Sequence, residues 1–155
     1  MPHPITLPES DLPELGQPLA GGILAAVGYR QNGTKYALVT ACKETGESKK
    51  KINWNDAMEF CAALGEGWKL PSLENATLLR ANCMPGTYVD FPAQTQIDIF
   101  KQGGPEAFET DDWYWTGDEA SADFAWVQLF DLGGQGYGTK GNRWRVRAVR
   151  EIDLI

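Results

Sequence analysis

The spacing of hydrophobic positions changes along the chain, and each spacing predicts a different element. Two apolar runs, residues 22–29 and 35–42, flank the sequence Arg-Gln-Asn-Gly-Thr. Asn-Gly favours the tight turn of a β-hairpin, so the two runs are predicted to be paired strands. Further along, apolar residues recur every three or four positions, which is the spacing of one helix face; they are Trp54, Ala57, Met58, Cys61 and Ala62.

Capping residues mark the starts of two predicted helices. Asn53 precedes the first helix and Ser72 precedes the second. The side chains of both residue types accept hydrogen bonds from the free N–H groups at a helix start. A third, shorter helix is expected over residues 91–101, with Pro92 in its first turn. Residues 44–51 are polar and are predicted to be a solvated loop.

The last third of the chain is rich in aromatic residues and holds four of the six tryptophans. Residues 113–116, 124–130 and 143–150 are predicted to be short antiparallel strands. The intervening loop, residues 131–142, holds five glycines and is expected to be mobile and to present Tyr137. In the last strand, apolar and basic residues alternate, as in a strand with one buried face; they are Trp144, Val146 and Ala148 against Arg143, Arg145 and Arg147.

Length and composition favour one α+β domain, expected over residues 21–155. Residues 1–20 hold five prolines, which lack a backbone donor and favour extended conformations, so this segment is predicted to be an extended arm. The arm either lies over the domain or serves attachment and homo-oligomerisation. No apolar run approaches the roughly 20 residues of a membrane helix, and no signal peptide opens the chain. We therefore expect synthesis in a host cytoplasm and no membrane insertion.

Charge and cysteine content limit the classes of partner and cofactor. The net charge of −7 argues against direct nucleic-acid binding, because a polyanion is repelled. Seven acids and no base lie in residues 106–123, whereas five bases lie in residues 140–150, so the two segments are expected to be neighbours. The three cysteines lack the spacing of a metal site or a disulfide framework and are expected to be free thiols.

Several short motifs together resemble one known family. The chain is similar to the bacterial and phage domain found at the C-terminus of collagen-like adhesins, within the superfamily of C-type-lectin-like and formylglycine-generating-enzyme-like proteins. The similarity spans about residues 20–150, and the motifs are Trp68–Ser72, Tyr114–Glu119, Ala125–Phe130 and Val146–Arg150. The resemblance implies a C-type-lectin-like fold with an N-terminal hairpin, two to three helices and C-terminal antiparallel aromatic strands, which presents variable loops on a rigid sheet.

The same resemblance argues against enzymatic activity and against a cofactor. Formylglycine-generating relatives act through cysteines in the C-terminal half, and no cysteine follows Cys83. The iron-dependent sulfoxide synthases of the superfamily require several histidines, and His3 is the single one. A nucleophile elbow, a Walker A motif and a zinc-protease motif are all absent from the sequence. No metal site is predicted, although carboxylates at Asp118, Glu119 and Asp123 leave calcium binding as an alternative.

The function expected from the sequence is therefore binding. The first hypothesis is a non-enzymatic module, encoded by a phage or prophage, that recognises a protein or glycan through its C-terminal loop face, for example as a receptor-binding protein of a virion. The alternative is an acidic intracellular inhibitor of a host nucleic-acid-binding or defence complex. Exposed aromatic and arginine side chains are typical interface anchors; the candidates are Trp113, Tyr114, Tyr137, Arg143, Trp144 and Arg145.

Overall fold

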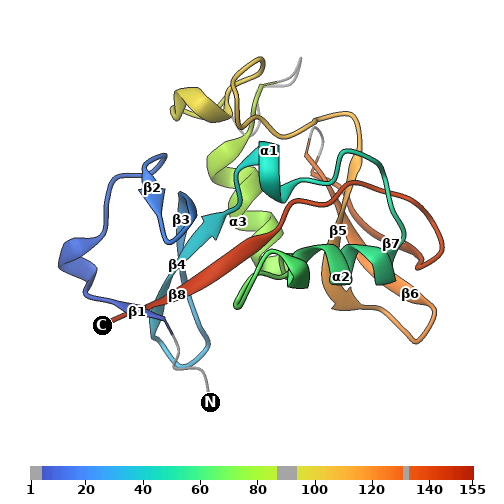
Figure 1. Ribbon diagram of the computed structural model, residues 1–155, viewed down its shortest axis with the longest axis horizontal. Coiled ribbons are helices and arrows are strands. Elements are labelled where there is room, and N and C mark those ends of the chain that lie inside the picture. The colour runs from blue at the N-terminus through green and yellow to red at the C-terminus, as the bar shows by residue number, and fades with distance from the viewer. Residues whose placement is uncertain (1–4, 87–93, 131–132) are drawn as a thin grey trace.

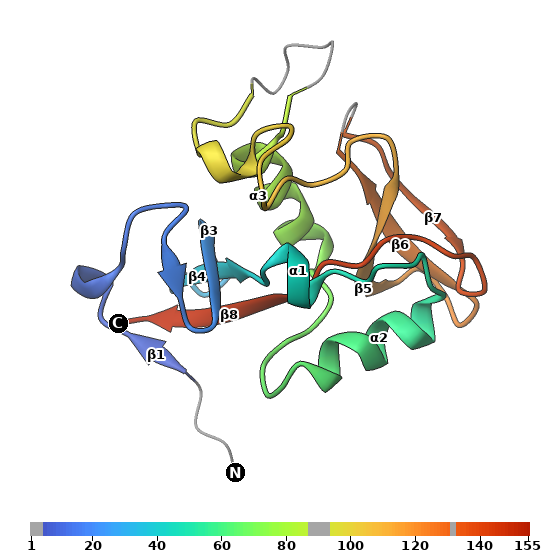
Figure 2. The same ribbon diagram turned by 45° about the horizontal axis from the view of Figure 1, so that its top comes forward.

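The computed structural model describes residues 5–86, 94–130 and 133–155 (Figure 1). Over these residues the chain forms a five-stranded sheet, a three-stranded sheet and three α-helices. This arrangement confirms the predicted α+β class. Figures 1 and 2 show the two sheets side by side with helix α3 between them.

The larger sheet has the strand order β1-β8-β4-β3-β2. Its centre is the predicted hairpin, formed by β3 (Gly22–Tyr29) and β4 (Lys35–Thr40), which pair antiparallel from Ile23 opposite Thr40 to Tyr29 opposite Lys35. The last strand, β8 (Val149–Leu154), runs antiparallel to β4. The sheet therefore brings the two ends of the sequence together.

The proline-rich segment supplies both edges of this sheet. Strand β1 (Thr6–Leu7) runs parallel to β8, and β2 (Pro18–Leu19) runs antiparallel to β3, with a 3-10 turn at Glu9–Asp11 between them. The sequence predicted an extended arm, but two short stretches of this segment, Thr6–Leu7 and Pro18–Leu19, pair with the sheet; residues 1–4 lie outside the described residues. The carbonyls of Ile5 and Leu7 accept hydrogen bonds from the N–H groups of Asp153 and Ile155 at the other end of the chain.

The two helices predicted from periodicity are present with the predicted caps. Helix α2 (Trp54–Ala63) begins after Asn53, whose side chain accepts the N–H of Asp56 at 2.9 Å. Helix α3 (Leu73–Cys83) begins after Ser72, which accepts the N–H of Asn75 at 3.0 Å.

Residues 43–46 form a short helix, α1 (Lys43–Gly46), at the start of the segment that was predicted to be a solvated loop. That prediction is wrong at Gly46 and Glu47, which are both buried. A Cβ at position 46 would lie 2.0 Å from Cβ of Ala41. Only glycine allows this close approach, which holds α1 against the end of β4.

The third predicted helix is not formed over its described part. Residues 91–93 lie outside the described residues, and the remainder contains one 3-10 turn, η2 (Asp98–Phe100). Phe100 is fully buried and its ring lies 6.2 Å from that of Phe108. One buried side chain is enough to anchor a single turn, whereas a longer helix needs an apolar stripe along its length.

The smaller sheet contains β5 (Trp113–Glu119), β6 (Phe124–Leu129) and β7 (Gln135–Thr139), all antiparallel. The first two strands confirm the prediction. The third is a correction, because β7 lies in the glycine-rich segment that was expected to be a mobile loop; residues 131–132 lie outside the described residues. The glycines allow this pairing: a Cβ at Gly138 would meet Cη2 of Trp144 at 2.4 Å.

The segment predicted as the last strand connects the two sheets. Residues 143–148 form single bridges to several partners, at Trp144 to Ile52, Arg145 to Tyr114 and Arg147 to Glu47, and regular strand structure begins at Val149. Its apolar face is buried at Val146 and Ala148, as predicted. Its basic face is not uniformly solvent-exposed, because Arg147 is 1% exposed.

Candidate functional site

The six predicted contact residues lie in different environments, and one of them is inaccessible. Tyr114 is 3% exposed and packs edge-on against Phe108 and Phe130. Its hydroxyl donates to Oε1 of Glu47 at 2.9 Å and accepts the N–H of Glu109 at 2.9 Å. Burial, followed by the charge of Glu47, raises the pKa of Tyr114 well above its usual value. The prediction that Tyr114 contacts a ligand is wrong, since α3 and residues 106–109 cover that face.

The two predicted tryptophans, Trp113 and Trp144, are half-buried at the inner face of the small sheet. The ring of Trp144 packs edge-on against fully buried Trp115, with centroids 4.6 Å apart. The ring of Trp113 lies beside Gly134 and Gly136, where a Cβ would lie 3.4 Å and 4.0 Å from its Cη2. Both rings contribute mainly to the packing of the sheet.

The two predicted arginines differ from each other. Arg143 is exposed and forms no ion pair with any described residue. Nε of Arg145 lies 3.3 Å from Oδ2 of Asp112. Nζ of Lys51 lies 2.7 Å from the same oxygen. Burial raises the pKa of Asp112, but the hydrogen bonds from Lys51 and the Trp113 N–H and the two positive charges outweigh it, so the pKa is lowered.

Tyr137 is exposed as predicted, with 61% of its surface accessible, and it belongs to a cluster. Its ring meets Trp126 with centroids 5.2 Å apart and Phe124 with centroids 5.9 Å apart, both edge to face. Trp126 lies directly opposite Tyr137 in the register of β6 and β7. Phe124 lies two residues from Trp126 on the same strand, and is 37% exposed. We call these three residues, Phe124, Trp126 and Tyr137, the aromatic face.

The alternation of β6 explains why these rings face outward. Ala125 and Val127 point into the core beside Trp115 and are at most 2% exposed. Successive side chains of a strand point to opposite sides, so Phe124 and Trp126 must point away from that core. Sequence reasoning missed both residues as candidates. The signal was present in the parity of Phe-Ala-Trp-Val, but both faces are apolar, and parity alone does not say which face is covered.

Charged groups at the rim of the small sheet are mostly acidic. Asp118, Glu119 and Asp123 are exposed. Oδ2 of Asp118 accepts the N–H of Leu73, and Lys140 Nζ lies 2.6 Å from Oε2 of Glu119. The contacts of Glu119 and Asp112 with Lys140 and Arg145 confirm that the acidic and basic segments are neighbours.

Metal ligation and thiol chemistry find little support in the described residues. Among them, no group of three or more His, Cys, Asp or Glu side chains is arranged to hold a metal ion. All three cysteines are free. Burial raises the pKa of Cys61 and of Cys83 to about 12, so both remain protonated at neutral pH, and a protonated thiol is a poor nucleophile.

Within the part of the chain that the structure describes, no helix is long and apolar enough to cross a bilayer. In comparisons with known proteins, no family model matches the chain and no match is found among the curated proteins.

Proposed function

We propose that the chain is a non-enzymatic binding module that recognises a partner protein through its aromatic face. The observation that carries this proposal is the cluster of exposed Phe124 and Tyr137 with half-buried Trp126 on a sheet whose other face is packed into the core. Each aromatic side chain buries about 150–250 Å² when it is covered. Trp and Tyr are also the residue types most enriched among those that dominate interface energies.

The geometry of the rings favours a protein over a glycan. A sugar ring stacks on a flat, open ring face, whereas here Tyr137 stands at 76° to Trp126 and at 87° to Phe124, so the three rings do not form a common plane. Such an edge-to-face cluster forms a ridged apolar surface that suits the side chains of a protein. The strands hold the rings in place, so little conformational entropy is lost on binding.

We also propose that the fold is C-type-lectin-like and that the chain is related to the adhesin-type domain of phages and bacteria. Support comes from the order of elements: a hairpin, two helices, aromatic antiparallel strands, and a last strand that returns to the hairpin. In this proposal the protein is encoded by a phage or prophage, and its small sheet presents the contact surface. Recognition of a receptor at the virion tip is then its role.

A second function, inhibition of a host nucleic-acid-binding or defence complex, is favoured by charge. The net charge is −7, and exposed acids lie at the rim of the small sheet. An acidic surface of this kind can occupy a basic groove, and its affinity then falls steeply with added salt. A receptor-binding module that relies on the aromatic face is expected to keep most of its affinity between about 0.05 and 0.5 M salt.

The test compares purified wild-type protein with the double variant Trp126→Ala and Tyr137→Ala. A partner captured from host cells, identified by mass spectrometry and then purified, should bind the double variant at least about 30-fold more weakly, because interface anchors contribute about 2 kcal/mol or more. Met58→Ala, which removes a 41% exposed side chain on α2, is the control and should leave affinity unchanged. Equal affinity of the double variant and wild type would refute the proposal. If no protein partner is captured and the double variant instead loses binding to a purified glycan, the ligand of the aromatic face is a glycan and not a protein.

A further inference from the structure

A cavity lies between the β3–β4 hairpin and helix α3. Its volume is about 330 Å³, at the lower end of the range of ligand pockets. The lining combines two tyrosines, one acid, one hydroxyl and two aliphatic side chains; they are Tyr29, Tyr36, Glu74, Thr77, Val27 and Leu78.

The aromatic wall of this cavity is fixed on one side and open on the other. Tyr36 is 5% exposed, and its hydroxyl donates to Oδ1 of Asn75 at 2.6 Å. The ring lies across the backbone at Gly28, where a Cβ would be 2.6 Å from its Cζ. Tyr29 is 67% exposed. The cavity therefore has one rigid ring and one accessible ring.

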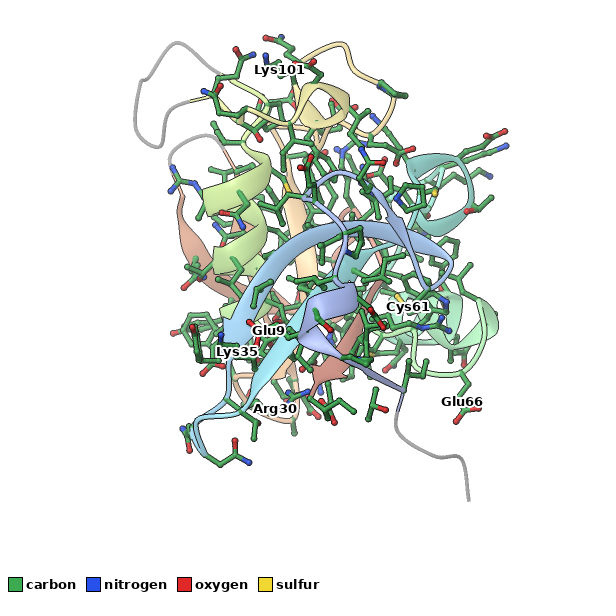
Figure 3. The ribbon with its side chains drawn as sticks, turned by 90° about the vertical axis from the view of Figure 1, so that its left-hand side faces the viewer. Glu9, Arg30, Lys35, Cys61, Glu66 and Lys101 are labelled. Carbon is green, nitrogen blue, oxygen red and sulfur yellow. The ribbon has the colours of Figure 1, made fainter. Side chains whose placement is uncertain are left out.

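The charge at the cavity comes from Glu74. Among the described residues this carboxylate forms no hydrogen bond or ion pair. The two cations nearby are already paired with carboxylates, and each also lies over one of the tyrosine rings: Cζ of Arg30 is 4.5 Å from the ring centre of Tyr36, and Nζ of Lys35 is 5.6 Å from that of Tyr29. Arg30 lies 2.7 Å from Oε1 of Glu151 and also binds Asp153, and Lys35 lies 2.8 Å from Oε1 of Glu9 (Figure 3). One unpaired negative charge therefore remains beside two tyrosines.

We infer that this cavity takes an arginine side chain of the partner protein. A guanidinium stacks on an aromatic ring and binds a carboxylate through two N–H groups, while its methylenes pack on aliphatic side chains. Tyr29, Glu74 and Leu78 supply these three contacts. The molecule already uses the same packing, both at this cavity, where Arg30 and Lys35 lie over Tyr36 and Tyr29, and at Trp68, where Arg150 lies 4.6 Å from the ring centre.

The inference rests on the proposed function, because a hydrogen bond links the lining of the cavity to β7, the strand that carries Tyr137. Thr77 lines the cavity, and its Oγ1 accepts a hydrogen bond from Nε2 of Gln135 at 2.9 Å. Gln135 lies two residues before Tyr137 on β7, so both side chains point to the same side of the sheet. A partner seated on the aromatic face can reach the cavity without a change of fold.

The probe for the test is N-acetyl-arginine amide, titrated into ¹⁵N-labelled protein and followed by amide chemical shifts. Saturable shifts are expected at Gly28, Tyr29 and Leu78. Glu74→Gln should weaken probe binding about fivefold, which is the upper end for one solvent-accessible ion pair. Glu66→Gln is the matched control, an exposed glutamate outside the cavity (Figure 3), and should bind as wild type does.

Three outcomes would overturn the inference: no saturable shifts at the cavity, equal shifts with the neutral isostere N-acetyl-citrulline amide, or unchanged binding in Glu74→Gln. Failure here is separable from failure of the proposed function. The Trp126→Ala and Tyr137→Ala variant should still bind the probe with wild-type affinity. If the probe does not bind and that variant still loses the partner, the assignment of the cavity is wrong, whereas the proposed function of the aromatic face is supported.

Discussion

Arg147 is a charged side chain with 1% of its surface exposed, and its contacts explain how the fold tolerates it. The guanidinium donates to the carbonyls of Glu106 at 3.2 Å and Ala107 at 3.4 Å, and stacks on Phe108 at 4.2 Å. Nε lies 3.4 Å from Oε1 of Glu47. A buried charge is tolerated when it is paired and hydrogen-bonded. Arg147 thereby ties the last segment of the chain to residues 106–108.

Replacement of Arg147 by alanine should be strongly destabilising. It leaves the carboxylate of Glu47 buried without its cation, which is expected to lower the free energy of unfolding by about 3–5 kcal/mol. Arg143→Ala is the control, because Arg143 is exposed and lies four residues away on the same segment; its effect should stay within about 0.5 kcal/mol. Urea denaturation measures both. Equal losses of unfolding free energy in the two variants would contradict the prediction that the buried position of Arg147 makes it important for stability.

At the scale of elements, the packing of β3 depends on the absence of a side chain at Gly22. A Cβ there would lie 2.4 Å from the carbonyl oxygen of Thr40 and 2.9 Å from the ring of Trp68. The first contact is with backbone and has no flexible end that could move aside. The close approach of β3 to the end of β4 therefore requires glycine.

Gly22→Ala should lower the free energy of unfolding by about 1–3 kcal/mol, the range for overpacking in a core. Gly141→Ala makes the same chemical change at a site with no atom within 4 Å of the new Cβ, so its effect should be small. Thermal and urea unfolding of the two variants give the comparison. A Gly22→Ala protein as stable as Gly141→Ala would mean that β3 shifts without cost.

At the scale of the whole molecule, Glu151 joins the hairpin, helix α3 and the last strand. This carboxylate on β8 binds Arg30 at 2.7 Å and also binds Lys69, and it accepts a hydrogen bond from Nδ2 of Asn75 at 3.3 Å. Burial raises the pKa of Glu151, but the hydrogen bonds and charges of Lys69 and Arg30 outweigh burial, so the pKa is lowered in the folded state.

This shift predicts how stability depends on pH. A glutamate has a pKa of about 4.3 in the unfolded chain. Since the folded value is lower, the stabilisation is present above about pH 4.3 and is lost as pH falls through the folded pKa. Urea unfolding at several pH values from 7 to 3 should show a smaller acid-induced loss for Glu151→Gln than for wild type, and a wild-type loss for Glu66→Gln. Identical profiles for all three proteins would contradict the assignment.

Elements that depend on contacts between neighbouring residues were predictable from the sequence. Asn-Gly specified the β3–β4 turn, and Asn53 and Ser72 specified the starts of α2 and α3, because turn and cap hydrogen bonds span a few residues. The exposure of Tyr137 was also predicted, since a tyrosine among glycines has few neighbours that could cover it.

The remaining features were not predictable, because they depend on contacts between residues far apart in the sequence. The proline-rich segment became two edge strands through the free carbonyls and N–H groups of its partners. Tyr114 is buried and Trp126 faces outward because α3 and residues 106–109 cover one part of the sheet and leave another open. An alternating strand specifies that two faces exist; packing by segments far along the chain selects which of them meets water.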